Sequence, residues 1–378
     1  MKNKILIVGA GITGITLAER FASKGSKVLL IEKRDHIGGN CYDCKDENGI
    51  LIHKYGPHIF YTDYKDVWDY ISKFTDWFYY QHKVLGLIDG RLAPIPFNLN
   101  TLYKLFPLKF AQKLEEKLIQ KFGYNKKVPI LELKKMKDKD LKFLADFIYE
   151  KIFLHYTEKQ WGLKPEEIDA SVTARVPVVI SRDDRYFQDK YQGMPKEGYT
   201  KMFKKMLKNE NITIQLNTNY KKIKNKIKYD FLFYTGPVDE FFNYKFGNLD
   251  YRCLKLDFQT FNQASYQPSA VVNYPNNYDF TRIIEFKKLT QQNHRKTTIG
   301  IECPGNEGFM AYPVLDEKNK KIFQKYSKEA EKLKKQNIYF AGRLAEYKYY
   351  NMDEAIKSSL DLFNKIVYKD KYYVNKSI

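Results

Sequence analysis

The alternation of apolar and polar positions predicts a β-α-β unit at the start of the chain. Residues 4–8 (KILIV) and 27–33 (KVLLIEK) are short apolar runs, and residues 15–25 (ITLAERFASKG) between them carry apolar residues at helical spacing up to a glycine. Two similar apolar runs appear much later, at 229–234 (YDFLFY) and 337–340 (NIYF). We therefore expect an α/β fold with a discontinuous, doubly wound domain into which other material is inserted.

The inserted material divides into a helical part and a strand-rich part. Residues 99–168 contain two stretches with apolar residues at helical spacing, KFAQKLEEKLIQKFG and LKFLADFIYEKIF. Residues 250–302 have the composition of strands separated by turns, and Asp89-Gly90 is a hairpin signal. We predict three interleaved lobes: a doubly wound domain (1–78, 190–245 and 318–378), a helical lobe (99–168) and an antiparallel sheet lobe for substrate (79–98, 169–189 and 246–317).

Composition and charge narrow the class of protein. Of the 378 residues, 43% are apolar, which is enough for a sizeable core. The formal net charge of +20 favours anionic partners, but the lysines are scattered except for a dense run from Lys204 to Lys228, and we interpret them as a solvated surface. A basic nucleic-acid-binding protein is an alternative, but the sequence has no recognised nucleic-acid module, and we expect no such partner.

Membrane and metal chemistry are not expected. No apolar run approaches 18 residues, and MKNK leads directly into the first strand, so we predict a cytoplasmic protein without membrane insertion. Cys41 and Cys44 form a CxxC without a second pair at zinc spacing, while Cys253 and Cys303 are isolated. We expect four free thiols and no metal site, and leave a redox role of Cys41 and Cys44 open.

The glycines that follow the first strand predict a dinucleotide site. GAGITG has the G-x-G-x-x-G register between a strand and a helix, and an acidic residue ends the second strand, where it can accept ribose hydroxyls. A second glycine pair follows in KRDHIGGN, and FAGR follows the last strand, as in flavoproteins of the glutathione-reductase type. FAD is therefore our prediction, and NAD is the alternative. The predicted cofactor-binding residues are Gly9, Gly11, Gly14, Glu32, Gly38, Gly39, Asn40, Gly342 and Arg343.

Further motifs resemble those of one family, the UDP-galactopyranose mutases, from Lys4 to about Leu360. The motifs are RDHIGGN (34–40), YGPHIF (55–60), YTEKQWG (156–162), ARVPV (174–178), RYFQDKYQGMPKEGYT (185–200), YTGPVD (234–239), YR (251–252), TRIIE (281–285) and GRLAEYKYYNMD (342–353). YTEKQWG and YQGMP are the most specific of these.

The resemblance implies an isomerase that interconverts the pyranose and furanose forms of a UDP-hexose. In this family, reduced FAD attacks the anomeric carbon through N5, UDP leaves, and a covalent flavin–sugar adduct forms without net redox change. The partner implied is a UDP-sugar, and the family often forms homodimers. The alternative is a flavin-dependent oxidoreductase of the amine-oxidase type, which shares the two glycine turns.

Roles for individual residues follow only from the resemblance. Two arginines would bind the diphosphate, one of them on a loop (about 167–178) that closes over substrate, and tyrosines would donate hydroxyls to it. The catalytic residues implied are Arg175, Arg282 and His58, of which His58 would lie against the flavin ring. The substrate-binding residues implied are Tyr156, Trp161, Arg175, Tyr186, Arg252, Asn273, Arg282, Tyr312 and Tyr349. Met352 would offer its backbone N–H to the cofactor, with Arg343 near it.

Five positions differ from what galactose-specific members usually carry. Tyr61 replaces a histidine of HIFHT, and His82 aligns with an asparagine beside the sugar; both are candidate sugar-binding residues. Asn351, Val179 and Ala311 also depart from the family pattern, whereas Asn273 is retained. Because the differences gather where the sugar would lie, we predict a preferred hexose other than plain galactose, either an N-acetylated or a deoxy relative.

Overall fold

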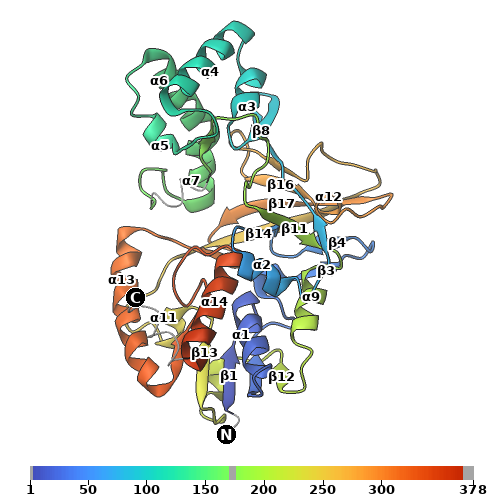
Figure 1. Cartoon of the computed structure of the whole chain (residues 1–378), viewed down its shortest axis with the longest axis vertical. Coiled ribbons are helices and arrows are strands. Elements are labelled where there is room, and N and C mark those ends of the chain that lie inside the picture. The colour runs from blue at the N-terminus through green and yellow to red at the C-terminus, as the bar shows by residue number, and fades with distance from the viewer. Residues whose placement is uncertain (1–2, 170–175, 369–378) are drawn as a thin grey trace.

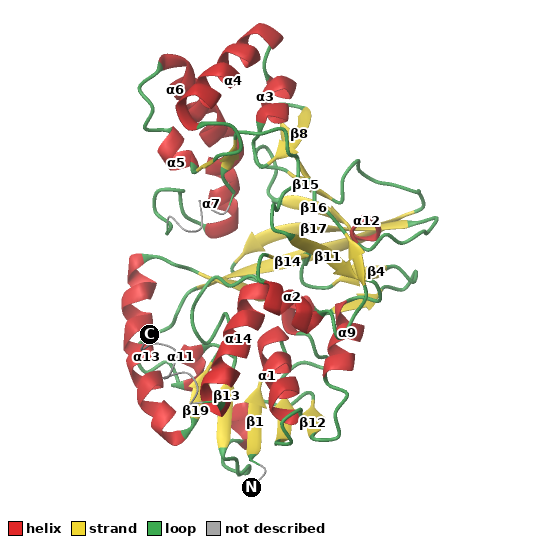
Figure 2. Ribbon diagram, in the orientation of Figure 1, coloured by secondary structure: helices red, strands yellow, loops and turns green. Residues whose placement is uncertain are grey.

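The computed structural model describes residues 3–169 and 176–368 and shows three tiers (Figure 1). A parallel sheet with helices on both faces lies at the bottom of the view, a larger sheet lies in the middle, and a group of helices lies at the top (Figure 2). The mixed α/β class predicted from the sequence is confirmed. No helix within the described ranges is long and apolar enough to cross a membrane.

The bottom tier is the doubly wound domain. Its five strands are all parallel, in the order β12-β2-β1-β13-β19. Alternate residues of β1 serve the two faces: Ile5 and Ile7 pack with α1 and α14, whereas Leu6 packs towards α10 and α11. The elements are β1 (Lys4–Val8), β2 (Lys27–Ile31), β12 (Ile212–Gln215), β13 (Phe231–Tyr234), β19 (Ile338–Phe340), α1 (Ile12–Ala22), α9 (Tyr199–Met206), α10 (Tyr220–Ile223), α11 (Val238–Phe241), α13 (Glu317–Leu333), the 3₁₀ turn η3 (Lys334–Gln336) and α14 (Met352–Val367).

The middle tier is a seven-stranded sheet in the order β18-β14-β17-β16-β15-β7-β8. Its pairs are antiparallel, as the sequence predicts, except that β15 runs parallel to β7. The predicted hairpin at Asp89-Gly90 joins β7 and β8. The elements are β7 (Val84–Ile88), β8 (Arg91–Ile95), β14 (Tyr251–Phe261), β15 (Val271–Asn273), β16 (Arg282–Glu285), α12 (Phe286–Leu289), β17 (Thr297–Gly305) and β18 (Phe309–Pro313).

The top tier is the helical lobe, which follows β8 directly. Asn98 begins the first helix with a capping box, in which its side chain accepts the N–H of Thr101. The last helices run on without a loop, because a π-helical turn joins α6 to α7. The elements are α3 (Leu99–Leu105), α4 (Leu108–Phe122), β9 (Lys127–Val128), α5 (Ile130–Leu133), α6 (Lys139–Ile148), η2 (Tyr149–Leu154), α7 (His155–Trp161) and β10 (Val178–Val179).

A small sheet of three strands lies beside the doubly wound domain, in the order β5-β11-β6. It pairs Tyr61 with Gln192 and thereby brings YGPHIF beside YQGMP. The predicted limits of the three lobes stay a prediction, and β11 belongs to this small sheet rather than to the parallel one. The strands of this sheet are β5 (Phe60–Thr62), β6 (Trp77–Tyr79) and β11 (Tyr191–Pro195). The other elements of this part of the chain are η1 (Gly39–Cys41), α2 (Lys65–Ile71) and a separate two-stranded sheet of β3 (Asp43–Lys45) and β4 (Leu51–His53).

Candidate active site

Two glycine turns meet at the carboxyl end of β1 and leave no room for side chains. A Cβ on Gly14 would lie 2.0 Å from the carbonyl oxygen of Gly9, and a Cβ on Gly39 would lie 2.9 Å from the Cα of Gly11. Gly9 and Gly39 have φ of +101° and +57°, and Gly38 pairs with Gly11 as an isolated bridge. The backbone at the start of α1 is therefore open to a close approach by phosphate oxygens.

Glu32 is held in position to bind a ribose. The side chain is buried, its Oε2 accepts the N–H of Ala10 at 2.9 Å and its Oε1 accepts the N–H of Arg34 at 3.0 Å. Each carboxylate oxygen keeps a further acceptor position, and Glu32 lines the cavity. The carboxylate can therefore accept hydrogen bonds from the two ribose hydroxyls of a dinucleotide bound at the carboxyl ends of β1 and β2.

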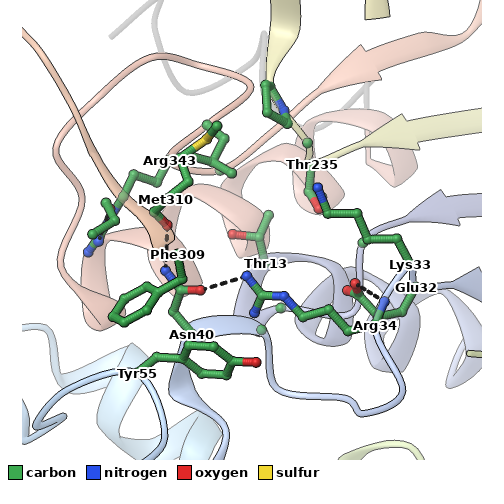
Figure 3. Close-up of a pocket in the computed structure, with 18 of the residues that line it drawn as sticks. Thr13, Glu32, Lys33, Arg34, Asn40, Tyr55, Thr235, Phe309, Met310 and Arg343 are labelled. Carbon is green, nitrogen blue, oxygen red and sulfur yellow. Dashed lines mark hydrogen bonds between the residues drawn. The ribbon is translucent and has the colours of Figure 1, made fainter. Parts of the chain in front are cut away.

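A cavity of about 840 Å³ runs from these turns towards α14. Asn40 bridges its two walls, because its Oδ1 accepts Arg34 Nη2 at 3.0 Å and its Nδ2 donates to the carbonyl of Met310 at 2.9 Å (Figure 3). Of the predicted cofactor residues, the cavity is lined by Gly9, Gly11, Glu32, Gly38, Gly39, Asn40, His58, Gly342, Arg343 and Met352, while Gly14 lies behind the turn. The size and the glycine floor fit a dinucleotide.

The sequence analysis did not single out several residues that line this cavity. Thr13, Tyr55, Thr235 and Phe309 lie around it in Figure 3. Tyr55 and Thr235 lie within two of the family motifs, YGPHIF and YTGPVD, and their place in these motifs was the signal that could have identified them as cavity residues. Phe309 contacts the ring of Tyr55 edge-on at 5.0 Å, a contact between segments more than 250 residues apart that no local pattern reveals.

His58 is neutral, and it lines the cavity. Its Nδ1 lies 2.8 Å from the carbonyl of Gly56, and because a carbonyl only accepts, Nδ1 carries the proton. Burial, with the neighbouring His53, lowers the pKa of His58 to about 3. Nε2 is therefore a hydrogen-bond acceptor, and the residue lines the cavity wall.

Arg343 and the start of α14 close the far end of the cavity. Arg343 donates to the carbonyls of Tyr350 and Ala311, the latter at 2.9 Å, and its guanidinium lies 5.3 Å from the ring centre of Tyr312. Asn351 caps α14 with a capping box, which places Met352 at the first helical position. Its N–H is therefore one of the amides that a helix start leaves for other acceptors.

An ion pair with a fully buried carboxylate lies in the neighbouring sheet. Arg282 Nη2 lies 2.7 Å from Glu302 Oε2 across strands β16 and β17, and Glu302 is fully buried. Burial disfavours the charge, but the Glu302 carboxylate outweighs it and raises the pKa of Arg282. Arg282 Nε and Asn273 Oδ1 are buried without a hydrogen-bond partner among the described residues. Both atoms are available to a bound polar ligand.

Aromatic residues surround this ion pair. Trp161 lies 5.5 Å from the ring of Tyr312 and 5.6 Å from that of Tyr349, and those two tyrosines are 5.1 Å apart. Burial raises the pKa of Tyr156, of Tyr186 (to about 12) and of Tyr312. The positive charge of Arg282 lowers all three pKa values, but by less than burial raises them. The phenols are therefore neutral hydroxyls that can donate to an anion.

Tyr61 and His82 lie in one aromatic stack. The ring of Phe187 lies 3.6 Å from Tyr61 and 6.0 Å from His82, nearly parallel to both. His82 is buried, its Nδ1 lies 3.2 Å from the hydroxyl of Tyr80, and burial lowers its pKa to about 3. The stack reaches the ion pair through Tyr186, whose ring meets His82 edge-on at 5.8 Å.

The remaining predicted residues have other surroundings. Arg175 lies outside the described residues. Arg252 has its guanidinium engaged by the carbonyls of Lys159 and Gln160 and by Asn306, so its predicted contact with substrate stays a prediction.

All four cysteines are free thiols, as predicted, and no group of three or more potential metal ligands occurs in the described ranges.

The fold and site define a class: an enzyme with a Rossmann-type dinucleotide domain and an attached sheet lobe that holds the cation of Arg282. A family model for UDP-galactopyranose mutase matches residues 151–349, and one for an NAD(P)-binding Rossmann-like domain matches residues 7–74. A probable UDP-galactopyranose mutase of Klebsiella pneumoniae is 37% identical over 95% of this chain and 94% of its own length. The chain belongs to the UDP-galactopyranose mutase family, which is a family of isomerases. Membership of this family, together with the Rossmann-like domain, implies a flavin cofactor.

Two further relatives show how far the similarity extends. A dTDP-fucopyranose mutase of Escherichia coli is 36% identical over 95% of this chain and 97% of its own length. A crystal structure of reduced UDP-galactopyranose mutase superposes with a TM-score of 0.73 at 17% identity, covering 98% of this chain and 95% of that one. The structural match confirms the fold.

Proposed function

We propose that the protein interconverts the pyranose and furanose forms of a UDP-hexose with reduced FAD as cofactor. The observation that carries the proposal is the half-buried Arg282, whose buried Nε has no partner among the described residues and which lies near the neutral phenols of Tyr156, Tyr186 and Tyr312. A guanidinium in such a place suits a diphosphate, because it stays charged and donates to oxygens from several N–H groups.

FAD fits the cavity on three grounds. Gly11 and Gly39 leave space for the diphosphate, Glu32 has free acceptor positions for the ribose, and the start of α14 offers the N–H of Met352. When bound and reduced, the flavin supplies the nucleophile for the anomeric carbon, and no net electron transfer occurs. The neutral Nε2 of His58 can only accept a hydrogen bond, so this residue suits a donor on the cofactor or the sugar.

The chain's own residues then bind and orient the nucleotide. Arg282, with Arg175 by family resemblance, would hold the diphosphate as it leaves, and Tyr186, Tyr312 and Tyr349 would donate to it. Tyr156 and Trp161, which share α7, would hold the uracil ring. Asn273 has a buried Oδ1 that lacks a partner among the described residues and would accept from a sugar hydroxyl.

We propose further that the sugar is a deoxy or N-acetylated relative of galactose. Tyr61 and His82 form an aromatic wall together with Phe187, which stacks on both. By the family resemblance, galactose-specific members carry a histidine and an asparagine in place of Tyr61 and His82. Such a wall offers a different set of hydrogen-bonding groups from a histidine and an asparagine, and its ring faces suit a methyl group. A relative named dTDP-fucopyranose mutase, at 36% identity, supports a change of sugar within this family.

The experiment is a turnover assay with the dithionite-reduced protein and three substrates: UDP-galactofuranose, UDP-N-acetylgalactosamine and a dTDP-deoxysugar. We expect ring interconversion of at least one, and faster turnover of a substituted sugar than of UDP-galactofuranose. Turnover of UDP-galactofuranose alone would refute the altered specificity but leave the mutase activity intact. Oxidation of a substrate with matching consumption of O₂ would support the amine-oxidase-type alternative instead.

Two further properties belong to this proposal. We propose a homodimer, on the family resemblance, and a cytoplasmic location. Light scattering of the purified protein tests the first, and fractionation of the source cells tests the second.

A further inference from the structure

Lys159 ties the end of α7 to the loop between β15 and β16. Its Nζ donates to three backbone carbonyls, those of Tyr274 at 2.6 Å, Tyr278 at 3.0 Å and Phe280 at 3.0 Å. An ammonium group has three donors, so all of them are used. Burial lowers the pKa of Lys159, which fits a group withdrawn from water between two lobes.

Arg252 makes the matching contact from the sheet lobe to the helix. It donates from Nε to the carbonyl of Gln160 and from Nη2 to that of Lys159, both at 3.0 Å. These carbonyls belong to the last turn of α7, where a helix leaves acceptors unused and favours a cation. Gly162 ends the helix with φ +70°, and a Cβ there would lie 3.3 Å from Arg252 Nη1.

The loop that Lys159 binds connects two residues of the candidate site. Asn273 is the last residue of β15 and Arg282 the first of β16, and the loop 274–281 joins them. The loop is packed on itself, because the rings of Tyr274, Tyr278 and Phe280 lie 4.8 to 5.1 Å apart. The loop is therefore a packed unit that joins Asn273 to Arg282.

The helix on the other side carries the residues proposed to hold uracil. Tyr156 and Trp161 lie on α7, one three residues before Lys159 and the other two residues after it. A third contact supports the same junction, since Asn276 Nδ2 donates to the carbonyl of Lys151 at 2.8 Å. The junction thus sets the position of the uracil side of the site relative to the diphosphate side.

We propose that Lys159 and Arg252 are positioning residues for the nucleotide: they fix the spacing between Tyr156 and Trp161 on α7 and Arg282 on β16. The inference rests on the proposed function, since it needs the nucleotide to span these two lobes. Neither side chain is required to touch the substrate. Loss of either side chain loosens the junction and displaces the residues that hold the nucleotide, so nucleotide binding weakens. The rate falls as well, because a displacement of about 1 Å is enough to lower it strongly.

The test compares Lys159→Met, which keeps the apolar stem and removes the donors, with Lys159→Arg, which restores donors. Lys164→Met is the matched control, because Lys164 is exposed on the same lobe, five residues further on. The readouts are the Kd of UDP by calorimetry, KM and kcat of the reduced enzyme, the FAD content and the Tm. We expect Lys159→Met to raise the Kd and KM about tenfold, with full FAD content, and Lys159→Arg to recover part of the loss.

Each outcome of these measurements either supports the positioning role of Lys159 or overturns it. Unchanged UDP affinity in Lys159→Met would overturn the inference, and so would a loss of FAD and Tm in proportion to UDP affinity, which marks general destabilisation. Wild-type protein that does not bind UDP would refute the proposed function itself, before any variant is compared. Arg252→Met should raise the Kd in the same direction, and the double variant should lose less than the product of the two single losses, since both residues serve one junction.

Discussion

Arg282 and Glu302 form an ion pair across two neighbouring strands, with Nη2 and Oε2 2.7 Å apart and Glu302 fully buried. Glu302 also accepts from the hydroxyl of Thr281, so the carboxylate is fixed before any ligand binds. The guanidinium keeps its Nε for another partner. The pair thus fixes a cation where we propose that the diphosphate binds.

Replacement of Arg282 by Ala should lower kcat by about 100- to 1,000-fold, because a group that stabilises developing charge is removed. FAD content should stay unchanged, since Arg282 does not line the cofactor cavity. The single variant also leaves a buried carboxylate unpaired, which costs about 3–5 kcal/mol of stability. The double variant Arg282→Ala/Glu302→Gln should regain stability but no activity. Flavin loss together with activity would show that Arg282 is misplaced in this account.

Arg175→Ala should have a similar effect on turnover. The prediction comes from the family resemblance, since Arg175 lies outside the described residues. We expect near loss of kcat with retained FAD, measured by the reduced-enzyme assay and by flavin absorbance. Lys164→Met is the control. Turnover close to wild type would remove Arg175 from the diphosphate site.

Gly14→Ala should impair cofactor binding, because the new Cβ would lie 2.0 Å from the carbonyl of Gly9. Such overpacking costs about 1–3 kcal/mol and displaces the turn that faces the diphosphate. We expect a lower flavin-to-protein ratio after purification. Gly305→Ala is the matched control, since its Cβ would meet nothing closer than 3.9 Å. Full flavin content in Gly14→Ala would contradict the assignment of this turn.

The protein should lose stability as the pH falls below about 6.5. Burial lowers the pKa of His53 to about 4 and that of His82 to about 3, against an ordinary value near 6.5. Below pH 6.5 the unfolded chain binds more protons than the folded one, so the free energy of unfolding decreases as the pH falls. Above pH 6.5 these histidines are neutral in both states and do not change it. His58, whose pKa burial lowers to about 3, acts in the same direction. At pH 5 the loss is about 2 kcal/mol for each of the three histidines.

Urea unfolding of the protein at pH 7.5 and pH 5 measures this loss. The variant His82→Gln removes one of the three titrating histidines and should show a smaller difference between the two pH values. An equal difference in the variant and the wild type would mean that His82 is not neutral in the folded protein.

Tyr61→His should move the sugar preference towards galactose. The change removes the ring stacked on Phe187 and restores an imidazole where galactose-specific members carry one. We expect the ratio of kcat/KM for UDP-galactofuranose to that for the preferred sugar to rise about tenfold or more. Tyr79→His, on a tyrosine that is 83% exposed, is the control. An unchanged ratio would separate Tyr61 from sugar recognition.

The sequence predicted the elements whose signals are local. The apolar runs of β1, β2, β13 and β19 and the glycine register were enough to place the dinucleotide cavity. Strand β12 was missed because three of its four residues are exposed and its apolar pattern is weak. It completes the sheet through pairing with β2, a contact that depends on the tertiary fold.

The site was predictable only as a set of residue types drawn from the family motifs. Nothing local shows that Arg252 reaches the carbonyls of α7, because the two segments are about ninety residues apart. The same holds for Lys159, whose three acceptors lie more than a hundred residues further on. Likewise, the sequence marked Tyr61 and His82 as unusual, but only the structure shows that Phe187 joins them.

The most direct test of the central claim follows the bond between the anomeric carbon and the diphosphate. The substrate that the enzyme turns over is labelled with ¹⁸O in the bridging position and incubated with dithionite-reduced protein. The account predicts that the label moves from the bridging to the non-bridging positions of the β-phosphate, in reduced but not in oxidised protein. Ring interconversion with the label fully retained in the bridge would contradict it, because the bond would then never have broken.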